Sequence, residues 1–344
     1  MPDSYGGDGQ DHKRARRLAC DLCGNPIVNR AEAHRVKRST WVHVECHENT
    51  LFEVPPAEPP VPLAKLGGAK IWTEHKAKLI ERYLYYFVLV TKHGTYIDGF
   101  AGPQDPEQLD TWSAKLALES RPRWMRRFHL FDADHDQVER LLALKAAQPP
   151  RDSSRKEPRR SIEIYEGDFN ARVQQLLASG SISPNEATFC LLDQRTFECE
   201  WATLQALANY RTTRHKIELF YFLPNMWLDR AFAAKHDETT LLRWWGRSDF
   251  DILRAITGIT RAQLVVKRIK DELGYASVKA YPIYEREGAG HTMYFMLHAT
   301  DHAEAPRLMT RAYRRVVLPT EPLEQLMLEL GISNLDAPDD GERD

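Results

Sequence analysis

The chain has 344 residues and a mass of 39.7 kDa, which is enough for one large domain with a smaller attachment. Its 47 basic and 49 acidic residues nearly cancel, so any affinity for a polyanion must come from local patches and not from the net charge. No apolar run is long enough to span a bilayer, and the polar, glycine-rich start lacks the features of a signal peptide, so we expect a cytoplasmic protein without a membrane anchor.

Residues 1–17 end in a basic cluster, Lys13 to Arg17, and we interpret them as a flexible arm. A run of this kind is typical of solvated surface, and it is also suited to contact with a phosphate backbone. The sequence alone leaves both interpretations open.

Residues 18–52 have the spacing of a zinc module. A Cys-x2-Cys pair is followed at finger-like distance by His-x2-Cys, and three thiolates with one imidazole suit tetrahedral zinc. We predict the ligands Cys20, Cys23, His43 and Cys46, with His34 or His47 as the alternative fourth ligand. Four protein ligands close the coordination sphere, so we expect the zinc to hold a short segment folded and not to catalyse.

A proline-rich stretch separates this module from the rest of the chain. Residues 53–68 contain a dense run of prolines, which favours an extended linker. We expect the main domain to span residues 69–335 and the acidic tail, residues 336–344, to be disordered.

The main domain alternates apolar strands with helices. A helix over 72–90, with Lys76 on its polar face, leads into a first strand that ends in the turn Asp98 to Pro103. Further strands are expected over 127–134, 161–170, 187–194 and 216–225, and a hairpin over 277–284 and 291–300. Near-continuous apolar strands with intervening helices predict a Rossmann-like, doubly wound, mainly parallel α/β sheet, here closed by an antiparallel hairpin.

Carboxylates follow four of these strands. They are Asp98, Asp132 with Asp134, Asp168 and Asp193. Polar groups at the carboxyl ends of parallel strands line one crevice, and a carboxylate can accept two ribose hydroxyl bonds at once. Any one of them is also suited to a helix N-cap, and Asp-Gly is an ordinary turn signal. Four in register favour a cofactor site.

These residues resemble a known fold and a known family. The run Asp98 to Pro103, the acid after the second strand, Gly167 to Phe169 and the closing hairpin resemble class I S-adenosylmethionine-dependent methyltransferases, especially DNA methyltransferases with an Asp-x-Phe-x-Gly motif. More narrowly, 72–103, 192–201 and 297–302 resemble the three-Cys-motif partner protein family, named for association with a radical-type three-cysteine protein. The resemblance covers about residues 70 to 320.

The resemblance implies a role for each candidate residue. Asp98 and Gly99 to Gly102, including Phe100 and Ala101, would hold the methionine end of S-adenosylmethionine. Asp132 would accept the ribose hydroxyls, and Asp168 with Phe169 would contact the adenine. Asp193 and Gln194 would orient a methyl acceptor, with Glu198 as a general base.

The chain departs from the family of amino-methylating enzymes at one point. After Asp193 and Gln194 it lacks the two prolines of their motif. Three functions therefore remain: a methyltransferase acting on nucleic acid, a catalytically inactive binding protein of the same fold, and a protein methyltransferase or accessory to a radical-type partner.

A basic face and several tryptophans are further candidates for contact with nucleic acid. Basic side chains recur at Lys267, Arg268 and Lys270 and at Arg307, Arg311, Arg314 and Arg315. They suit either a binding face beside the crevice or an ordinary solvated helix face. Trp227, Trp244 and Trp245 suit the core, although an exposed one would be able to stack on a base.

Overall fold

The computed structural model describes residues 33–37, 40–43, 71–105, 107–152, 157–233, 238–286 and 289–317. The chain divides into two compact units, Met1–Pro55 and Pro56–Asp344. In the smaller unit, β1 (Ala33–Lys37) pairs antiparallel with β2 (Thr40–His43). The predicted arm 1–17, linker 53–68 and tail 336–344 lie outside the described residues.

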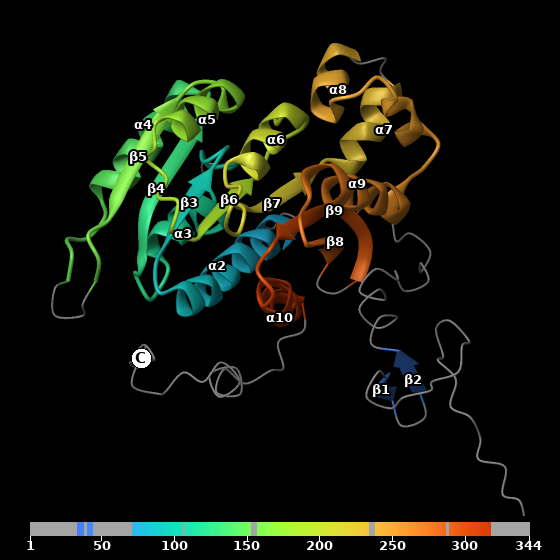
Figure 1. Ribbon diagram of the computed structural model, residues 1–344, viewed down its shortest axis with the longest axis horizontal. Coiled ribbons are helices and arrows are strands. Elements are labelled where there is room, and N and C mark those ends of the chain that lie inside the picture. Colours follow the sequence, from blue (N-terminus) through green and yellow to red (C-terminus); the bar gives the residue numbers. More distant parts are fainter. Residues whose placement is uncertain are drawn as a thin grey trace, which may run out of the picture. The chain divides into compact units, whose positions relative to one another are not determined.

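The larger unit is built on a seven-stranded sheet in the order β5-β4-β3-β6-β7-β9-β8 (Figure 1). The strands are β3 (Gly94–Asp98), β4 (Met125–Asp132), β5 (Ser161–Glu166), β6 (Thr188–Leu192), β7 (Glu218–Leu223), β8 (Ser277–Arg286) and β9 (Ala289–Thr300). The first five are parallel, β9 runs antiparallel to β7, and β8 runs antiparallel to β9. The predicted α/β sheet with a closing hairpin is confirmed at this level.

The burial of the strands explains their composition. All residues of β3, β6 and β7 are buried, whereas the edge strand β5 is only half-buried to exposed. Helices cover both faces of a mainly parallel sheet, so its central strands bury side chains on both sides and read as continuous apolar runs.

Nine α-helices are described in the larger unit. They are α2 (Ile71–Thr91), α3 (Ser113–Glu119), α4 (His135–Ala146), α5 (Phe169–Ala178), α6 (Trp201–Asn209), α7 (Asn225–Ala233), α8 (Glu238–Trp245), α9 (Gly258–Leu273) and α10 (Ala305–Val317), with the 3₁₀ turns η3 (Leu109–Thr111) and η4 (Phe250–Arg254). One large core joins α2, α3, α4 and α10 to the sheet. On the other side, α6 contacts α5, α8 and α9. In the described residues no helix is both long and apolar enough to cross a membrane.

Helix α2 differs from the amphipathic helix that the sequence predicts. Every residue from Tyr83 to Leu89 is buried, and only Lys78 and Glu81 are fully exposed among its residues of known burial. The cause is α10, which packs against α2 together with α3 and β8 (Figure 1). A helix covered on several sides is apolar around much of its circumference.

Candidate functional site

The turn after β3 is held by backbone bonds to both neighbouring strands. The amide of Gly99 donates to the carbonyl of Leu191 on β6 at 3.0 Å, and the amide of Ala101 donates to that of Phe131 on β4 at 2.7 Å. A Cβ at Gly102 would lie 2.5 Å from Oδ2 of Asp132. A side chain at this position would therefore force the loop away from the strand ends.

Asp132 connects two loops at the end of β4. Its Oδ2 accepts the amide of Gly102 at 2.8 Å, and its Oδ1 accepts the amide of Asp134 at 3.0 Å. The side chain is half-buried, and each carboxylate oxygen has a second lone pair. Asp132 is thus fixed in place and still able to accept hydrogen bonds from a hydroxyl group.

Asp98 is a buried acid at the end of β3. Only 1% of its surface is exposed, and it accepts bonds from the Tyr96 hydroxyl at 2.9 Å and the Phe100 amide at 3.2 Å. Burial raises the pKa of Asp98 to about 7, and the nearby carboxylate of Asp193 adds to this increase, while the two hydrogen bonds oppose it. Asp98 is therefore an acid that changes charge near neutral pH.

Asp193 directly follows the last residue of β6 and forms a buried ion pair. The ammonium of Lys76 on α2 lies 2.5 Å from its Oδ2, and the two side chains are 4% and 7% exposed. The side-chain Nε2 of Gln104 also donates to Oδ2, at 3.1 Å. The other oxygen, Oδ1, is buried without a hydrogen-bond partner within the described part of the chain.

These residues enclose a small cavity. Lys76, Asp98 and Asp193 line it together with the turn Phe100 to Gly102 and the segment Thr111 to Ser113. Its volume is about 10 Å³, close to what one buried water needs. Trp112 supports this wall, because its indole donates to the carbonyl of Ala101 at 2.6 Å.

Lys76 was placed on the polar face of α2 by the sequence analysis, and this prediction is wrong. Lys76 is only 3% exposed, because its ammonium pairs with the buried carboxylate of Asp193. Helical spacing contained a signal: Lys76 lies four and seven residues before the buried Ile80 and Tyr83, on the same stripe of the helix.

Gln194 is bound to the backbone on both sides in this structure. It is fully buried, its Nε2 donates to the carbonyl of Phe222 on β7 at 3.0 Å, and its Oε1 accepts the amide of Cys199 at 2.9 Å. Both ends of the amide are used by the backbone, and Gln194 is not among the residues that line the cavity. It links the loop after β6 to β7, and its predicted role of orienting a methyl acceptor stays a prediction.

Glu198 is exposed and accepts the amide of Thr196 at 2.6 Å. This bond closes a local turn in the loop that precedes α6. Glu198 is also absent from the lining of the cavity. A role as general base is therefore a prediction that the present geometry leaves open.

Two of the acidic strand ends cap helices. Asp134 accepts the amides of Asp136 and Gln137 at the start of α4, and Asp168 accepts the amide of Asn170 at the start of α5. Asp168 is exposed. For these two residues the alternative reading as N-caps holds, although an exposed cap keeps lone pairs for a ligand.

Phe169 belongs to the core beneath the turn. It is 2% exposed, and its ring contacts those of Phe100 and Phe131 at centroid distances of 5.7 and 5.2 Å. A Cβ at Gly99 would lie 3.0 Å from the Phe169 ring. Phe169 therefore supports the turn from below, and Phe100, which lines the cavity, is the ring better placed for a ligand.

Most of the predicted zinc site lies outside the described residues. Of its ligands, only His43 is in a described strand, at the end of β2, where its backbone pairs with that of Ala33. Among the residues that the structure describes, no group of three or more His, Cys, Asp or Glu side chains is arranged to hold a metal. Zinc binding by Cys20, Cys23, His43 and Cys46 stays a prediction.

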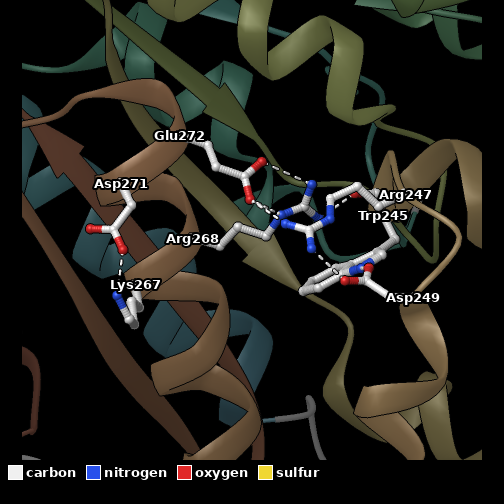
Figure 2. Close-up of polar contacts among 7 residues, drawn as sticks. All are labelled: Trp245, Arg247, Asp249, Lys267, Arg268, Asp271 and Glu272. Atoms are coloured by element: carbon white, nitrogen blue, oxygen red, sulfur yellow. Dashed lines mark hydrogen bonds and ion pairs between the residues drawn. The ribbon is translucent and has the colours of Figure 1, made fainter.

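Two of the three basic residues predicted to form a face on α9, Lys267 and Arg268, make ion pairs within the protein (Figure 2). Arg268 is 5% exposed, and its guanidinium makes two bonds to Glu272, at 2.7 and 3.0 Å. It also stacks between two indoles, 3.9 Å from the ring centroid of Trp201 and 4.1 Å from that of Trp245. Lys267 pairs with Asp271 on the surface.

The tryptophans are mainly core residues. Trp244 and Trp245 are each 3% exposed, and Trp227 is half-buried against the ring of Phe222. Neither Trp244 nor Trp245 is available to stack on a base. The expectation that they belong to the core is confirmed.

Comparisons with known proteins add little to this description. No family model matches the chain, and no curated protein matches its sequence. Among solved structures, the chain is similar to protein LPL1258 from Legionella pneumophila strain Philadelphia 1, of family model DUF519, with a TM-score of 0.40 and 10% identity over 74% of this chain and 95% of that one. None of these comparisons supports the resemblance to the three-Cys-motif partner family, which stays a prediction.

Proposed function

We propose that this protein is an S-adenosylmethionine-dependent methyltransferase that acts on nucleic acid. The observation that supports the proposal most directly is the position of the acidic cavity. Strand β3 has β4 as its neighbour on one side and β6 on the other. The chain adds β4 and β5 outward in one direction and then β6 and β7 in the other, so the strand order reverses between β3 and β6. In open α/β sheets, ligands bind outside the carboxyl ends of the strands at such a reversal, and Asp98 and Asp193 lie on its two sides.

The residues present suit the cofactor in two respects. Asp132 keeps acceptor capacity for ribose hydroxyls beside a turn whose glycine at 102 permits close approach. Asp98 lies in the cavity wall, where it would hold the ammonium of the methionine end, and the buried Oδ1 of Asp193 lacks a donor, which an acceptor amine would supply. Adenine contact by Asp168 and Phe169 fits less well, because Phe169 is covered by its neighbours.

Bound at this edge, S-adenosylmethionine would supply an electrophilic methyl group. The residues of the chain would have to position an acceptor amine in line with it, and Asp193 is the side chain at this edge best suited to accept a hydrogen bond from that amine. For this, the ion pair between Lys76 and Asp193 must open, since the cavity has space for about one water.

Calorimetry with S-adenosylmethionine tests the first half of the proposal. We expect binding of one molecule per chain, and a loss of affinity of about tenfold or more in Asp132→Ala, because each ribose bond to a charged acceptor contributes about 1.5 to 3 kcal/mol. The matched control is Asp136→Ala, which removes an exposed acid in the first turn of α4. Absence of heat with the folded protein, or equal affinity in Asp132→Ala, would contradict it.

The acceptor class needs a separate measurement. We expect transfer of a labelled methyl group to DNA or RNA, together with nucleic-acid binding that weakens steeply with salt, since basic residues replace counterions on the phosphates. Transfer to protein alone, with no retention of nucleic acid, would instead favour a protein methyltransferase. Co-purification with a radical-type partner would favour the accessory role.

A second function, binding without catalysis, is favoured by one specific observation. Gln194 is tied to the backbone at both ends, and Asp193 is neutralised by Lys76, so the predicted acceptor site is closed. This alternative predicts salt-dependent nucleic-acid binding that is equal with and without S-adenosylmethionine, and no methyl transfer.

A further inference from the structure

A second cavity lies at the opposite edge of the sheet from the acidic site. It is formed where β6 and β7 begin and where β9 ends, between the carboxyl half of α2 and the start of α10, two helices that pack against each other (Figure 1). Its volume is about 180 Å³. An engineered cavity of about 150 Å³ holds one benzene molecule, so a ligand the size of one ring with a short substituent would fit.

The walls of this cavity are largely apolar. Phe87 and Val90 of α2 face Ala305 and Leu308 of α10 across it, with Ala187 at the start of β6. Apolar walls favour a ligand with an apolar body, since burial of such a body is the main source of affinity in pockets of this kind.

Arg211 has a buried donor without a partner in the described part of the chain. Arg211 is 8% exposed, and its Nη2 donates to the carbonyls of Ser183 and Glu186, at 3.0 and 2.7 Å, and to the hydroxyl of Thr188 at 2.7 Å. Its Nε is buried without a hydrogen-bond partner among the residues that the structure describes. A buried donor without an acceptor is costly, and an anionic group entering the cavity would supply one.

The two carboxylates in the walls already have partners. Oε2 of Glu186 pairs with Arg127 and accepts the hydroxyl of Thr95. Oε1 makes no hydrogen bond in the described part of the chain, and Nδ1 of His93 lies 3.2 Å from it. Glu218 accepts bonds from His298 Nε2 at 2.9 Å and Thr300 Oγ1 at 3.0 Å, and a third from the Tyr83 hydroxyl. Each of the two carboxylates therefore already lies beside a basic group of the chain.

The remaining charges in the lining are basic. The segment before β7 contributes Arg214, His215 and Lys216, and the ring of His302 lies 5.2 Å from that of His215. Lys216 Nζ donates to a neutral carbonyl, that of Ala208, at 3.2 Å, so its charge is not cancelled. The potential of the cavity therefore favours an anion.

We propose that this cavity is a binding site for a small carboxylate with an apolar, ring-sized body. The carboxylate lies toward Arg211 and the basic segment before β7, and the body packs between α2 and α10. No residue of the acidic site takes part, so the proposal is independent of the proposed function and adds a second ligand to this protein.

The test uses the full-length chain and benzoate as the probe. Calorimetry at neutral pH and low salt should detect one benzoate per chain with a Kd on the order of 1 mM, as expected for a ligand with so few atoms. Benzyl alcohol and benzylamine have nearly the same shape with no charge and with a positive charge. Both should bind about tenfold more weakly or worse, because neither provides an anionic acceptor.

Two variants and one control locate the site. Ala305→Leu fills the apolar part without changing charge, and Arg211→Lys keeps the charge but removes the Nε donor; about tenfold and about fivefold losses of benzoate affinity are expected. Arg243→Gln, an exposed arginine on α8, should change nothing. No benzoate binding by protein that melts cooperatively, equal binding of the alcohol or amine, or unchanged binding in Ala305→Leu would overturn the proposal.

Discussion

At the scale of single residues, the acidic edge contains carboxylates with different tasks. Asp134 and Asp168 cap helices, Asp132 ties two loops together, and Asp193 is paired with Lys76. Burial raises the pKa of Asp98 to about 7. Perturbed acids in a cleft are candidates for function, and here the perturbation also has a cost in stability that can be measured.

Asp98→Asn should remove a pH dependence of folding. Because the folded-state pKa of Asp98 is about 7 and the ordinary value is about 4, the native protein binds one more proton than the unfolded chain between pH 4 and 7. Its stability therefore falls as pH rises through this window, by about 4 kcal/mol at most. Urea unfolding at pH 5 and pH 8 should give a smaller loss for Asp98→Asn than for the native chain. The same loss in both proteins would contradict this assignment.

Lys76→Met should destabilise the protein by about 3 to 5 kcal/mol, because it leaves the buried carboxylate of Asp193 without a counterion. The double variant Lys76→Met with Asp193→Asn should recover much of this loss, since it removes the uncompensated charge. Denaturant unfolding of the two single variants and the double variant measures the coupling. Additive effects in this cycle would show that the two side chains do not depend on each other.

At the scale of elements, Arg268 is one of two buried arginines on α9, together with Arg261. Figure 2 shows Arg268 beside Trp245 and Glu272. The guanidinium also lies over the ring of Trp201 on α6. The arginine also donates to the carbonyl of Trp245. Gly246 has a φ of +75°, and a Cβ there would lie 2.6 Å from Trp201, so the turn after α8 needs glycine to lie this close to Trp201.

Arg268→Ala should therefore strongly lower the stability of the protein, although it replaces a residue on a surface helix. We expect a loss of about 3 kcal/mol or more, because the change leaves the carbonyl of Trp245 and the two indoles without their buried partner. Lys267→Ala, the neighbour whose ion pair with Asp271 is exposed, should change stability by less than about 0.5 kcal/mol. Thermal unfolding compares them, and equal effects would contradict the buried stack.

At the scale of the whole molecule, the sequence predicts the sheet better than the site. Apolar runs followed by acids located the five parallel strands, because strands buried on both faces are recognisable from composition. The sequence did not reveal the burial of Lys76, because this burial depends on the carboxylate of Asp193, which is distant in the sequence. The hydrogen bond between the side-chain amide of Gln194 and the carbonyl of Phe222 was also not evident from the sequence, because that carbonyl comes into place only when β7 pairs with β6. Side-chain roles of this kind depend on tertiary neighbours, which a local pattern does not contain.

The division into two units leads to the last prediction. Met1–Pro55 and Pro56–Asp344 are separate compact units, and all predicted zinc ligands belong to the first. Removal of zinc with a chelator, or the variant Cys20→Ser, should abolish the folding of that unit, because short zinc modules are unfolded without metal. The larger unit has its own core, so its melting temperature, followed by helical circular dichroism, should shift by less than about 2 °C. Full-length protein that contains less than one zinc per chain would refute the zinc site, and a large shift in the main transition would show that the two units depend on each other for stability.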